Sequence, residues 1–346
     1  MRIRSIAFAV SFVALFWLSC ATAVNAQSAV VKMTPLGSHT GELCRNDRAL
    51  LFEDPTGVRI LYDPGRTIDE SDGRLGDVHV MLLSHAHNDH IGDVRPSAGG
   101  GTCAAPATGA ANPNTNFAGI AALKNAAVLA PGELSTYLTR KILDVRGTAP
   151  AACAENGLEN SFDVPLSAPC TASLRPGGSR TARRAGSAAG VKIAAVQAIH
   201  SNGVAAALVD SPGVAAGLSG YGGSEGGFVI KFTNGLVAYL TGDTGLFGDM
   251  DTIISRFYRP TLVVLNMSDT VTLGPTEATF MMKTLVKPRS VVPSHVNEQA
   301  TAGGVVRGGT RVALFESSVR DSVDVVVPLS DVTRSFDGSG RCIGCR

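Results

Sequence analysis

The chain of 346 residues is 45% hydrophobic, which is enough for one large domain or two ordinary ones with a sizeable core. Its 30 Lys and Arg residues nearly balance its 29 Asp and Glu residues, giving a formal net charge of +1. A chain so near neutrality offers no electrostatic basis for nucleic-acid binding. The partner that we expect is a small-molecule substrate. The composition carries no signal for an oligomeric state.

Residues 1–26 have the organisation of a secretory signal peptide. Arg2 and Arg4 precede an apolar run over residues 6–18, and small residues then lead to the expected cleavage point. This run is too short to span a bilayer, which takes roughly 20 residues. We expect a periplasmic or secreted protein without stable membrane insertion. A lipoprotein anchored through Cys20 is a weaker alternative, because the residues before it suit lipidation poorly.

Removal of the signal peptide would leave six of the seven cysteines, and an even number in an exported chain predicts disulfides. Cys153 and Cys170 enclose a short segment and are the first pair that we predict; the sequence leaves the remaining connectivity open. Cys342 and Cys345 have the CxxC spacing of redox or zinc sites. Because the chain has no second CxxC, a structural disulfide or a frayed end is favoured for the C-terminal tail, residues 336–346.

Short apolar runs alternate with turn signals from residue 30 to residue 83, which predicts successive strands. Leu50-Leu51-Phe52, for example, precedes Asp54-Pro55-Thr56-Gly57, and the run from Val58 to Tyr62 precedes Asp63-Pro64-Gly65.

Residues 97–190 differ in composition, being rich in Ala, Gly, Pro and Ser. Helices are predicted around Phe117 to Val128 and around Glu133 to Leu143. The run from Arg175 to Arg184 is predicted to be an exposed loop. We interpret the region as an insertion rather than as a separate domain.

Strands resume after the insertion. They are predicted at Val191 to Ile199, Gly227 to Thr233, Leu236 to Thr241, Leu262 to Asn266 and Ser322 to Val327. A helix is predicted from Pro275 to Leu285, with an acidic residue in its first turn, where negative charge is favoured. Strands and helices on both sides of the insertion predict one layered α/β or α+β domain over residues 27–335.

The segment SHAHNDH, residues 84–90, directly follows a predicted buried strand and holds three of the seven histidines. His85 and His87 can bind one metal ion, and Asp89 and His90 follow one turn later and can face a second. Imidazole plus carboxylate suits zinc and tolerates iron or manganese. The alternative, a polar helix start with solvated histidines, suits a single histidine better than three beside an aspartate.

Four residues cannot complete two metal shells, so further ligands are expected where other strands end. His200 directly follows the strand predicted at residues 191–199. Asp243 lies in TGDTG, at the end of the strand predicted at residues 236–241, and His295 follows the apolar residues 291–293. His79 falls inside a predicted strand and is interpreted as a packing or hydrogen-bonding residue. His39 is interpreted as a loop residue.

The order HAHNDH, His200, TGDTG and PSHVNE resembles the metallo-β-lactamase fold superfamily. The segments TGDTGLFGDM, LGPTEATFMM and VVPSHVN are similar to its branch of metal-dependent hydrolases, which includes ascorbate-phosphate lactonases and the phospholipase D acting on N-acyl phosphatidylethanolamines. The similarity covers roughly residues 30–97 and 190–330. It implies an αββα sandwich of two mixed sheets with helices outside and metals at one edge.

The resemblance implies two divalent ions, with Zn²⁺ favoured and Mn²⁺ or Fe²⁺ as alternatives. By the family pattern the first ion is held by His85, His87 and His200, the second by Asp89, His90 and His295, with Asp243 bridging both and Asp63 supporting the site from behind.

Adjacent cations imply hydrolysis, because even one zinc lowers the pKa of a bound water to roughly 7. A metal-bridging hydroxide would attack a carbonyl carbon or a phosphorus atom. Asp89 is the candidate catalytic residue, since it could orient that hydroxide and pass a proton to the leaving group. The chain is therefore interpreted as an exported hydrolase acting on an ester, lactone or phosphodiester.

Several alternatives stay open. An acyl-homoserine lactone lactonase suits an exported enzyme, although AIHSNG around His200 departs from the HTPGH pattern of those lactonases. A periplasmic β-lactamase is less favoured, because many zinc β-lactamases have a cysteine where this chain has Asp243. A non-catalytic metal-binding protein is the remaining class.

Two segments have undecided roles in substrate binding. Arg180, Arg183 and Arg184 could meet an anionic substrate, although a solvated loop is favoured. The Gly-rich residues 217–227 form either a flexible connector or a substrate loop.

Overall fold

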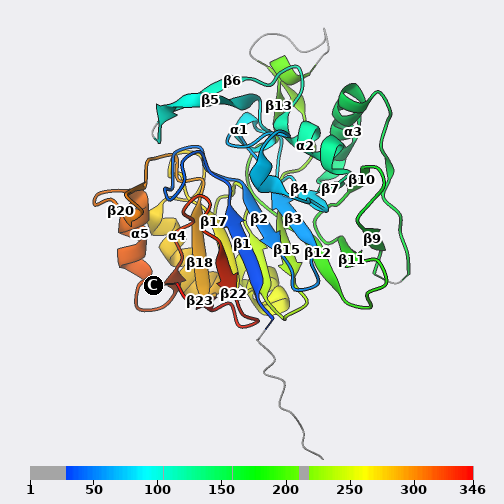
Figure 1. The fold of residues 1–346 in the computed structure, drawn as a ribbon. Helices are drawn as coiled ribbons and strands as arrows, with labels where there is room; N and C mark the ends of the chain where they lie inside the picture. The colour runs from blue at the N-terminus through cyan, green and yellow to red at the C-terminus, as the bar shows by residue number, and fades with distance from the viewer. Residues whose placement is uncertain (1–28, 104, 158, 210–217, 346) are drawn as a thin grey trace, which may run out of the picture.

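The computed structural model describes residues 29–103, 105–157, 159–209 and 218–345. Within them, two β-sheets pack face to face and helices cover their outer faces (Figure 1). The predicted signal peptide, residues 1–26, lies outside the described residues.

The larger sheet has nine strands in the order β23-β22-β1-β2-β3-β4-β7-β10-β8. Strands from β3 through β10 run parallel, whereas β1, β2 and the C-terminal strands pair antiparallel. The strands are β1 (Val31–Pro35), β2 (Leu50–Glu53), β3 (Arg59–Tyr62), β4 (Val80–Leu82), β7 (Ala127–Ala130), β8 (Ala151–Ala152), β10 (Cys170–Ser173), β22 (Arg334–Phe336) and β23 (Cys342–Ile343).

The smaller sheet has eight strands in the order β21-β18-β17-β16-β15-β12-β11-β9. It is parallel from β16 to β21 and antiparallel from β11 to β16. The strands are β9 (Ser161–Val164), β11 (Ser179–Arg184), β12 (Gly190–Gln197), β15 (Gly226–Lys231), β16 (Val237–Leu240), β17 (Leu262–Asn266), β18 (Ser290–Ser294) and β21 (Asp324–Val325).

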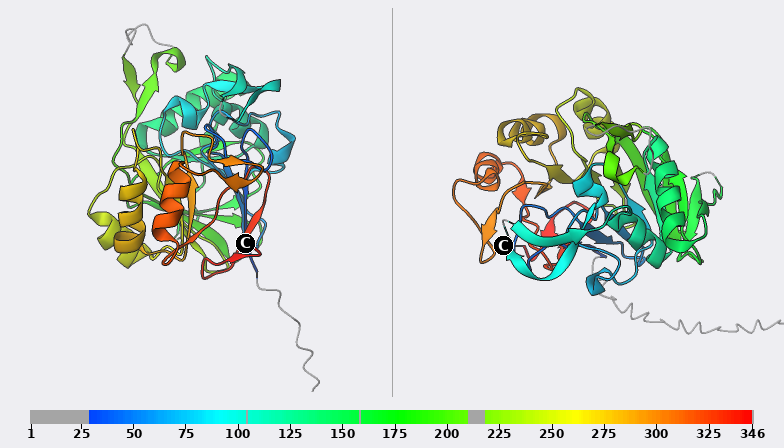
Figure 2. Two further views of the ribbon diagram at one scale, coloured as in Figure 1. Left: turned by 90° about the vertical axis from the view of Figure 1, so that its left-hand side faces the viewer. Right: turned by 90° about the horizontal axis from the view of Figure 1, so that it is seen from above.

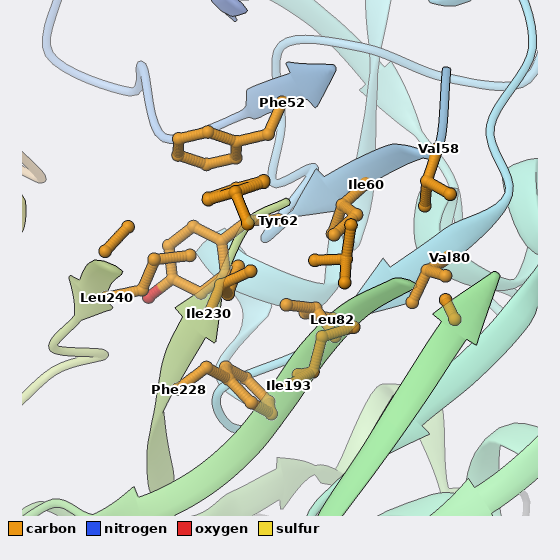
Figure 3. Packing of buried hydrophobic residues seen from close by; sticks show 14 of the residues in the cluster. Phe52, Val58, Ile60, Tyr62, Val80, Leu82, Ile193, Phe228, Ile230 and Leu240 are labelled. Carbon is orange, nitrogen blue, oxygen red and sulfur yellow. The ribbon is translucent and has the colours of Figure 1, made fainter. Parts of the chain in front are cut away.

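One apolar core fills the space between the sheets (Figure 3). Phe52, Tyr62 and Leu82 of the larger sheet lie opposite Phe228 and Leu240 of the smaller sheet, and all five are buried. The Tyr62 and Phe228 rings meet edge to face, with centroids 6.4 Å apart. Burying a side chain of this size contributes about 1.5–3 kcal/mol, so this layer fixes the spacing of the two sheets.

Helices pack on the two outer faces (Figure 2). On the larger sheet lie α2 (Asn116–Lys124) and α3 (Gly132–Arg146), whose apolar side chains join the outward residues of β2, β3 and β4. On the smaller sheet lie the π-helices η3 (Met250–Tyr258) and η4 (Met281–Val286) with α4 (Pro275–Phe280) and α5 (Arg311–Val319). The resulting αββα order confirms the predicted fold class.

The interpretation of residues 97–190 as an insertion is corrected by the sheet order. The segment supplies β7, β8 and β10 to the larger sheet and β9 and β11 to the smaller one, and β7 lies directly beside β4. The helix predicted to reach Val128 ends at Lys124, because Asn125 adopts the left-handed conformation and caps it. The chain then enters β7, so this region is integral to the sandwich.

The run from Arg175 to Arg184 is also not an exposed loop, since it contains β11. Arg180 is buried and donates to Glu155 and to backbone carbonyls of the neighbouring segment. Arg184 Nη1 lies 2.9 Å from His79 Nε2, and Arg183 Nη2 donates a hydrogen bond to Glu159 Oε2. Sequence reasoning missed the strand because arginines alternate here with small residues rather than with large apolar ones.

Three disulfides join the described cysteines. The pair predicted first, Cys153–Cys170, is confirmed, and Cys342–Cys345 closes the CxxC of the tail. The tail itself pairs with β1 through β22, so it is ordered into the sheet. The third bridge, Cys44–Cys103, links residues 59 positions apart. It ties the loop before β2 to the hairpin formed by β5 (Val94–Thr102) and β6 (Ala105–Ala110).

Short hairpins and one-turn helices complete the fold. The hairpins are β5 (Val94–Thr102) with β6 (Ala105–Ala110), β13 (Gly203–Ala205) with β14 (Ser219–Tyr221) and β19 (Thr301–Ala302) with β20 (Val305–Val306), and the one-turn helices are η1 (Gly73–Leu75) and η2 (Ala206–Leu208). The first hairpin lies above α1 (Asn88–Ile91) at the upper edge of the sheets (Figure 1). Of the helices described, none is long and apolar enough to cross a membrane.

Candidate metal centre

Five of the predicted ligands follow the carboxyl ends of four strands. His85 and His87 come after β4, His200 after β12, Asp243 after β16 and His295 directly after β18. The strands β12, β16 and β18 run in one direction, because two antiparallel pairings separate β12 from β16 and the pairings from β16 to β18 are parallel. Their carboxyl ends therefore meet at one edge of the sandwich, as ligand-bearing strand ends do in layered α/β folds.

Asp89 and His90 lie on α1, the four-residue helix that follows β4. His90 is fully buried and points with His85 into the interior, their ring centroids 4.1 Å apart. Asp89 is less enclosed, with 26% of its side chain exposed. The single turn of α1 therefore places the buried His90 imidazole and the partly exposed Asp89 carboxylate at the same centre.

The seven predicted ligands form three overlapping groups. Within each group, the ligand atoms lie within 4.8 Å of one another. The groups are His85, His87 and His200; His85, His90 and Asp243; and Asp89, His90 and His295. Each contains donors that suit zinc and related transition metals.

Asp243 lies in the middle of these groups. Its Oδ2 is 3.3 Å from His295 Nε2, 3.6 Å from His200 Nε2 and 3.9 Å from His85 Nε2, while its Oδ1 is 3.4 Å from His90 Nε2. Its side chain is 2% exposed. One carboxylate thus faces ligand atoms on both sides of the centre.

The backbone before Asp243 requires glycine. Gly242 has φ +59°, and a Cβ atom on it would lie 2.6 Å from the carbonyl oxygen of Gly226. Its N–H instead donates to the hydroxyl of Tyr62 at 3.1 Å. Asp63, His295 and Asn297 also adopt positive φ without being glycine, so the backbone at the centre carries strain at these positions.

Hydrogen bonds behind the ligands fix the tautomers of His85 and His90. The Ser84 hydroxyl donates its one proton to Asp63 Oδ2 at 2.7 Å, so in its contact with His85 Nδ1 at 3.0 Å it must accept the Nδ1 proton. Asp63 Oδ2 also accepts from His90 Nδ1 at 2.8 Å. In their neutral forms, both rings therefore present an Nε2 lone pair to the centre.

Those two Nε2 atoms are buried, and neither has a hydrogen-bond partner among the described residues. The nearest carboxylate oxygen to His90 Nε2, Asp243 Oδ1, is 3.4 Å away and outside hydrogen-bond geometry. A buried acceptor without a donor is costly unless another group satisfies it. A metal ion bound between these nitrogens would do so, and the residues present fit one.

Burial and mutual repulsion depress the basicity of most of these histidines. Burial lowers the pKa of His85 well below its ordinary value, and repulsion by His90 adds to the effect. Burial also lowers the pKa values of His87 and His295. Neutral imidazole is the form that binds metal, so these rings need not lose a proton near pH 7.

His90 and the carboxylates behave differently. Burial alone would lower the pKa of His90, but Asp243, Asp63 and Asp89 outweigh it and raise the pKa to about 10. Burial opposes ionisation of Asp89 and Asp243, yet Arg48 beside the first and His90 beside the second hold each pKa well below its usual range. The centre therefore attracts positive charge, either as protons or as a metal ion.

Proteins described as metal-dependent hydrolases are similar to this chain over most of its length. A UPF0173 metal-dependent hydrolase of Cupriavidus taiwanensis is 31% identical over 257 residues, which cover 72% of each chain. A UPF0173 metal-dependent hydrolase of Polynucleobacter asymbioticus is 26% identical over 336 residues, covering 94% of this chain and 95% of the relative. The chain belongs to the UPF0173 metal-dependent hydrolase family. No model in a scan of protein families matches it.

Solved structures give the same fold for this UPF0173 hydrolase. A metallo hydrolase from the archaeon Ignicoccus hospitalis aligns with a TM-score of 0.56 at 22% identity, covering 89% of this chain and 99% of the other. A metallo-β-lactamase fold protein from Bacillus subtilis aligns with a TM-score of 0.51 at 12% identity, covering 88% and 99%. The suspected superfamily is thereby confirmed at the level of fold.

Arg48 belongs to the centre of this UPF0173 hydrolase but was not predicted from the sequence. It is 4% exposed, and its Nη2 lies 2.5 Å from Asp89 Oδ2 and 2.9 Å from both His295 Nε2 and Asn297 Oδ1. It precedes β2, so it enters at the amino end of a strand. The antiparallel register that pairs Leu50 with Tyr62 brings this end of β2 to the carboxyl end of β3.

Three amides and one carboxylate that were not predicted as supporting residues also hold the ligands in place. Asn266 donates to Asp243 Oδ1 at 2.7 Å, and Asn202 accepts from the backbone N–H of Ala86, between the first two histidines, at 2.7 Å. Glu225 accepts from the His200 backbone N–H at 3.1 Å. Asn297 receives a bond from Arg48. Asn202 and Asn297 each lie two residues after a ligand, which is too weak a sequence signal alone, and Asn266 and Glu225 lack even that.

Three further predictions concern His79, His39 and the Gly-rich segment. His79 is buried and accepts from the Arg59 backbone N–H at 2.9 Å, which confirms its hydrogen-bonding role. His39 lies in a loop beside Cys44, as predicted. Of residues 217–227, the first lies outside the described residues; the others include β14 and Glu225 and so reach the centre through His200.

Proposed function

We propose that this UPF0173 protein is an exported hydrolase that uses metal-activated water to cleave an ester or lactone, with phosphodiesters as the alternative substrate class. The observation that carries the proposal is the convergence of seven imidazole and carboxylate ligands with two buried, unpartnered Nε2 atoms among the described residues. The three disulfides support export, since disulfides persist in oxidising compartments.

The residues that would hold metal are the three overlapping groups. His85, His87 and His200 offer one set of nitrogens, Asp89, His90 and His295 offer a second set, and Asp243 faces both. A divalent ion bound there supplies Lewis acidity and lowers the pKa of a bound water to roughly 7.

Asp89 is the best-placed residue for proton transfer. Its side chain is 26% exposed, whereas that of Asp243 is 2% exposed, so Asp89 is the ligand carboxylate nearer to solvent. Its depressed pKa keeps it ionised and able to accept a proton. Asp89 would therefore orient the attacking water and pass its proton toward the leaving group.

Apolar side chains flank the centre and favour an apolar substrate group. Ile199 precedes His200 and is 47% exposed, and Leu246 follows Asp243 by three residues and is 36% exposed. The two segments are joined by a bond of 3.0 Å from the Gly245 N–H to the Ile199 carbonyl. Exposed apolar residues next to a polar centre suit the acyl part of an ester or lactone better than a phosphodiester.

A substrate panel tests the reaction class. Purified enzyme is assayed with a p-nitrophenyl acyl ester, a long-chain acyl-homoserine lactone, bis(p-nitrophenyl) phosphate and nitrocefin, with and without chelator. We expect chelator-sensitive hydrolysis of the ester or lactone. Turnover of the phosphodiester or of nitrocefin alone would contradict the preferred class, and no turnover by metal-loaded protein would favour the non-catalytic alternative.

A further inference from the structure

Arg48 lies within the ligand group formed by Asp89, His90 and His295. Its Nη2 lies 2.5 Å from Asp89 Oδ2 and 2.9 Å from His295 Nε2, and these two ligand atoms are themselves 3.1 Å apart. A guanidinium nitrogen is always a donor, so His295 Nε2 accepts a hydrogen bond from it. The lone pair engaged in that bond is the one through which His295 would bind a metal ion.

The guanidinium has little freedom to leave. The Arg48 side chain is 3% exposed. Its Nε and Nη1 are buried without hydrogen-bond partners in the described parts of the chain, so Asp89 is its only ion-pair partner there. Removing the guanidinium from Asp89 would leave a buried charge uncompensated, which is strongly unfavourable.

The loop that carries Arg48 is held from several sides. Asp47 accepts backbone N–H groups of Ser38 and Cys44 at 2.9 and 2.8 Å. The neighbouring Leu43 bonds to Thr301 Oγ1 at 2.8 Å, and Cys44 is bridged to Cys103. The position of Arg48 is thus set by a packed loop rather than by an extended flexible arm.

The ligand group formed by His85, His87 and His200 contains no such guanidinium. The hydrogen bonds described for Arg48 go to Asp89, His295 and Asn297, and none goes to His85, His87 or His200. The two groups therefore differ in electrostatics: one combines three imidazoles with Asp243, and the other already contains a permanent cation. A second divalent ion would meet repulsion from the guanidinium and competition for His295.

We propose that Arg48 is the fixed cation of the ligand group formed by Asp89, His90 and His295. The protein then binds one divalent metal ion tightly at His85, His87, His200 and Asp243 and a second only weakly. This inference rests on the proposed function, since it presupposes the metal centre. It replaces the two ions that the family resemblance implies with one tightly bound ion and one guanidinium.

Metal counting tests the inference without any activity assay. Full-length mature protein is stripped with chelator, titrated with Mn²⁺ or Zn²⁺, and analysed by calorimetry and elemental analysis. We expect about one tight equivalent for wild-type protein, and about two for Arg48→Met, with second-site affinity raised at least about tenfold. The Mn²⁺ electron paramagnetic resonance spectrum should change from that of an isolated ion to that of an exchange-coupled pair.

Two ligand variants and a control complete the design. His295→Ala should keep the single equivalent, whereas His200→Ala should lose it; this comparison holds even if Arg48→Met fails to fold. Arg180→Met removes an equally buried arginine far along the chain and should leave the stoichiometry unchanged. Two tight equivalents in wild-type protein that fall to one in His295→Ala would overturn the inference. No metal in any variant would instead overturn the proposed function.

Discussion

Asp63 and Ser84 share two hydrogen bonds in the interior, from the Ser84 backbone N–H to Oδ1 at 2.9 Å and from its hydroxyl to Oδ2 at 2.7 Å. The pair sits behind the centre and determines which nitrogen of His85 would face a metal ion. Because one hydroxyl links a carboxylate to a ligand ring, small changes at Ser84 should be felt as changes in metal binding.

Ser84→Ala is expected to weaken metal binding by roughly 10- to 100-fold, the usual effect of losing a partner that orients a ligand. The variant leaves His85 Nδ1–H without its acceptor and frees the ring to take the other tautomer. Calorimetric titration with Zn²⁺ measures the change. Ser290→Ala is the matched control, because Ser290 is buried on β18 and its hydroxyl has no hydrogen-bond partner in the described chain. Equal affinities of Ser84→Ala and wild-type protein would refute the tautomer argument.

Asp243→Asn tests the carboxylate that faces every group of ligands. The substitution preserves shape but removes the charge that lies within 3.9 Å of four histidines. We expect metal affinity and hydrolysis to fall by about a hundredfold or more, beyond the range for supporting residues. Asp251→Asn, at a half-buried position away from the centre, serves as the control. Retained metal content in Asp243→Asn would show that this carboxylate is not a ligand.

Metal removal should lower thermal stability. A ligand present at about 100 times its dissociation constant stabilises the native state by about 2.7 kcal/mol, which corresponds to a shift of several degrees in Tm for a domain of this size. Scanning calorimetry with chelator and with added Zn²⁺ measures the difference. His200→Ala should show the same low Tm under both conditions. A chelator effect that persists in His200→Ala would point to metal bound elsewhere.

Much of the centre could be predicted because its ligands obey one rule. His200, Asp243 and His295 each follow an apolar strand, and carboxyl ends of parallel-running strands converge without any knowledge of the loops between them. Arg48 does not obey the rule, since it precedes its strand. Only the pairing of β2 with β3, a long-range contact, brings it to the centre.

The sheet contribution of residues 97–190 was hidden for a different reason. β7 is the four-residue run Ala127–Ala130, with alanine at both ends, and by composition it resembles the end of the preceding helix more than a strand rich in β-branched residues. Its assignment depends on tertiary contacts with β4, which outweigh local propensity. Asn125, in the left-handed conformation, ends α2 and separates it from β7.

His79 should make stability depend on pH. Burial lowers its pKa, and the nearby Arg184 lowers it further. A histidine whose pKa is lower in the folded state stabilises the protein when neutral, so this contribution is present above the unfolded pKa of about 6.5 and is lost as the pH falls below it. We expect the Tm difference between wild-type protein and His79→Asn, in chelator at both pH values, to shrink from pH 8 to pH 5. A constant difference would exclude this role.

The two long-range disulfides should contribute unequally to stability. In the loop-entropy description, a bridge that closes about 60 residues contributes about 4 kcal/mol and one that closes about 18 residues contributes about 3 kcal/mol. Cys44 and Cys103 are 59 positions apart, whereas Cys153 and Cys170 are 17 apart. Replacing each pair by serine and measuring denaturant unfolding should therefore give the larger loss for the first pair. Cys44–Cys103 also holds the loop that carries Arg48, so its removal should in addition alter metal stoichiometry, and removal of Cys153–Cys170 should not. Equal effects of both replacements on metal binding would show that the bridge contributes only to stability.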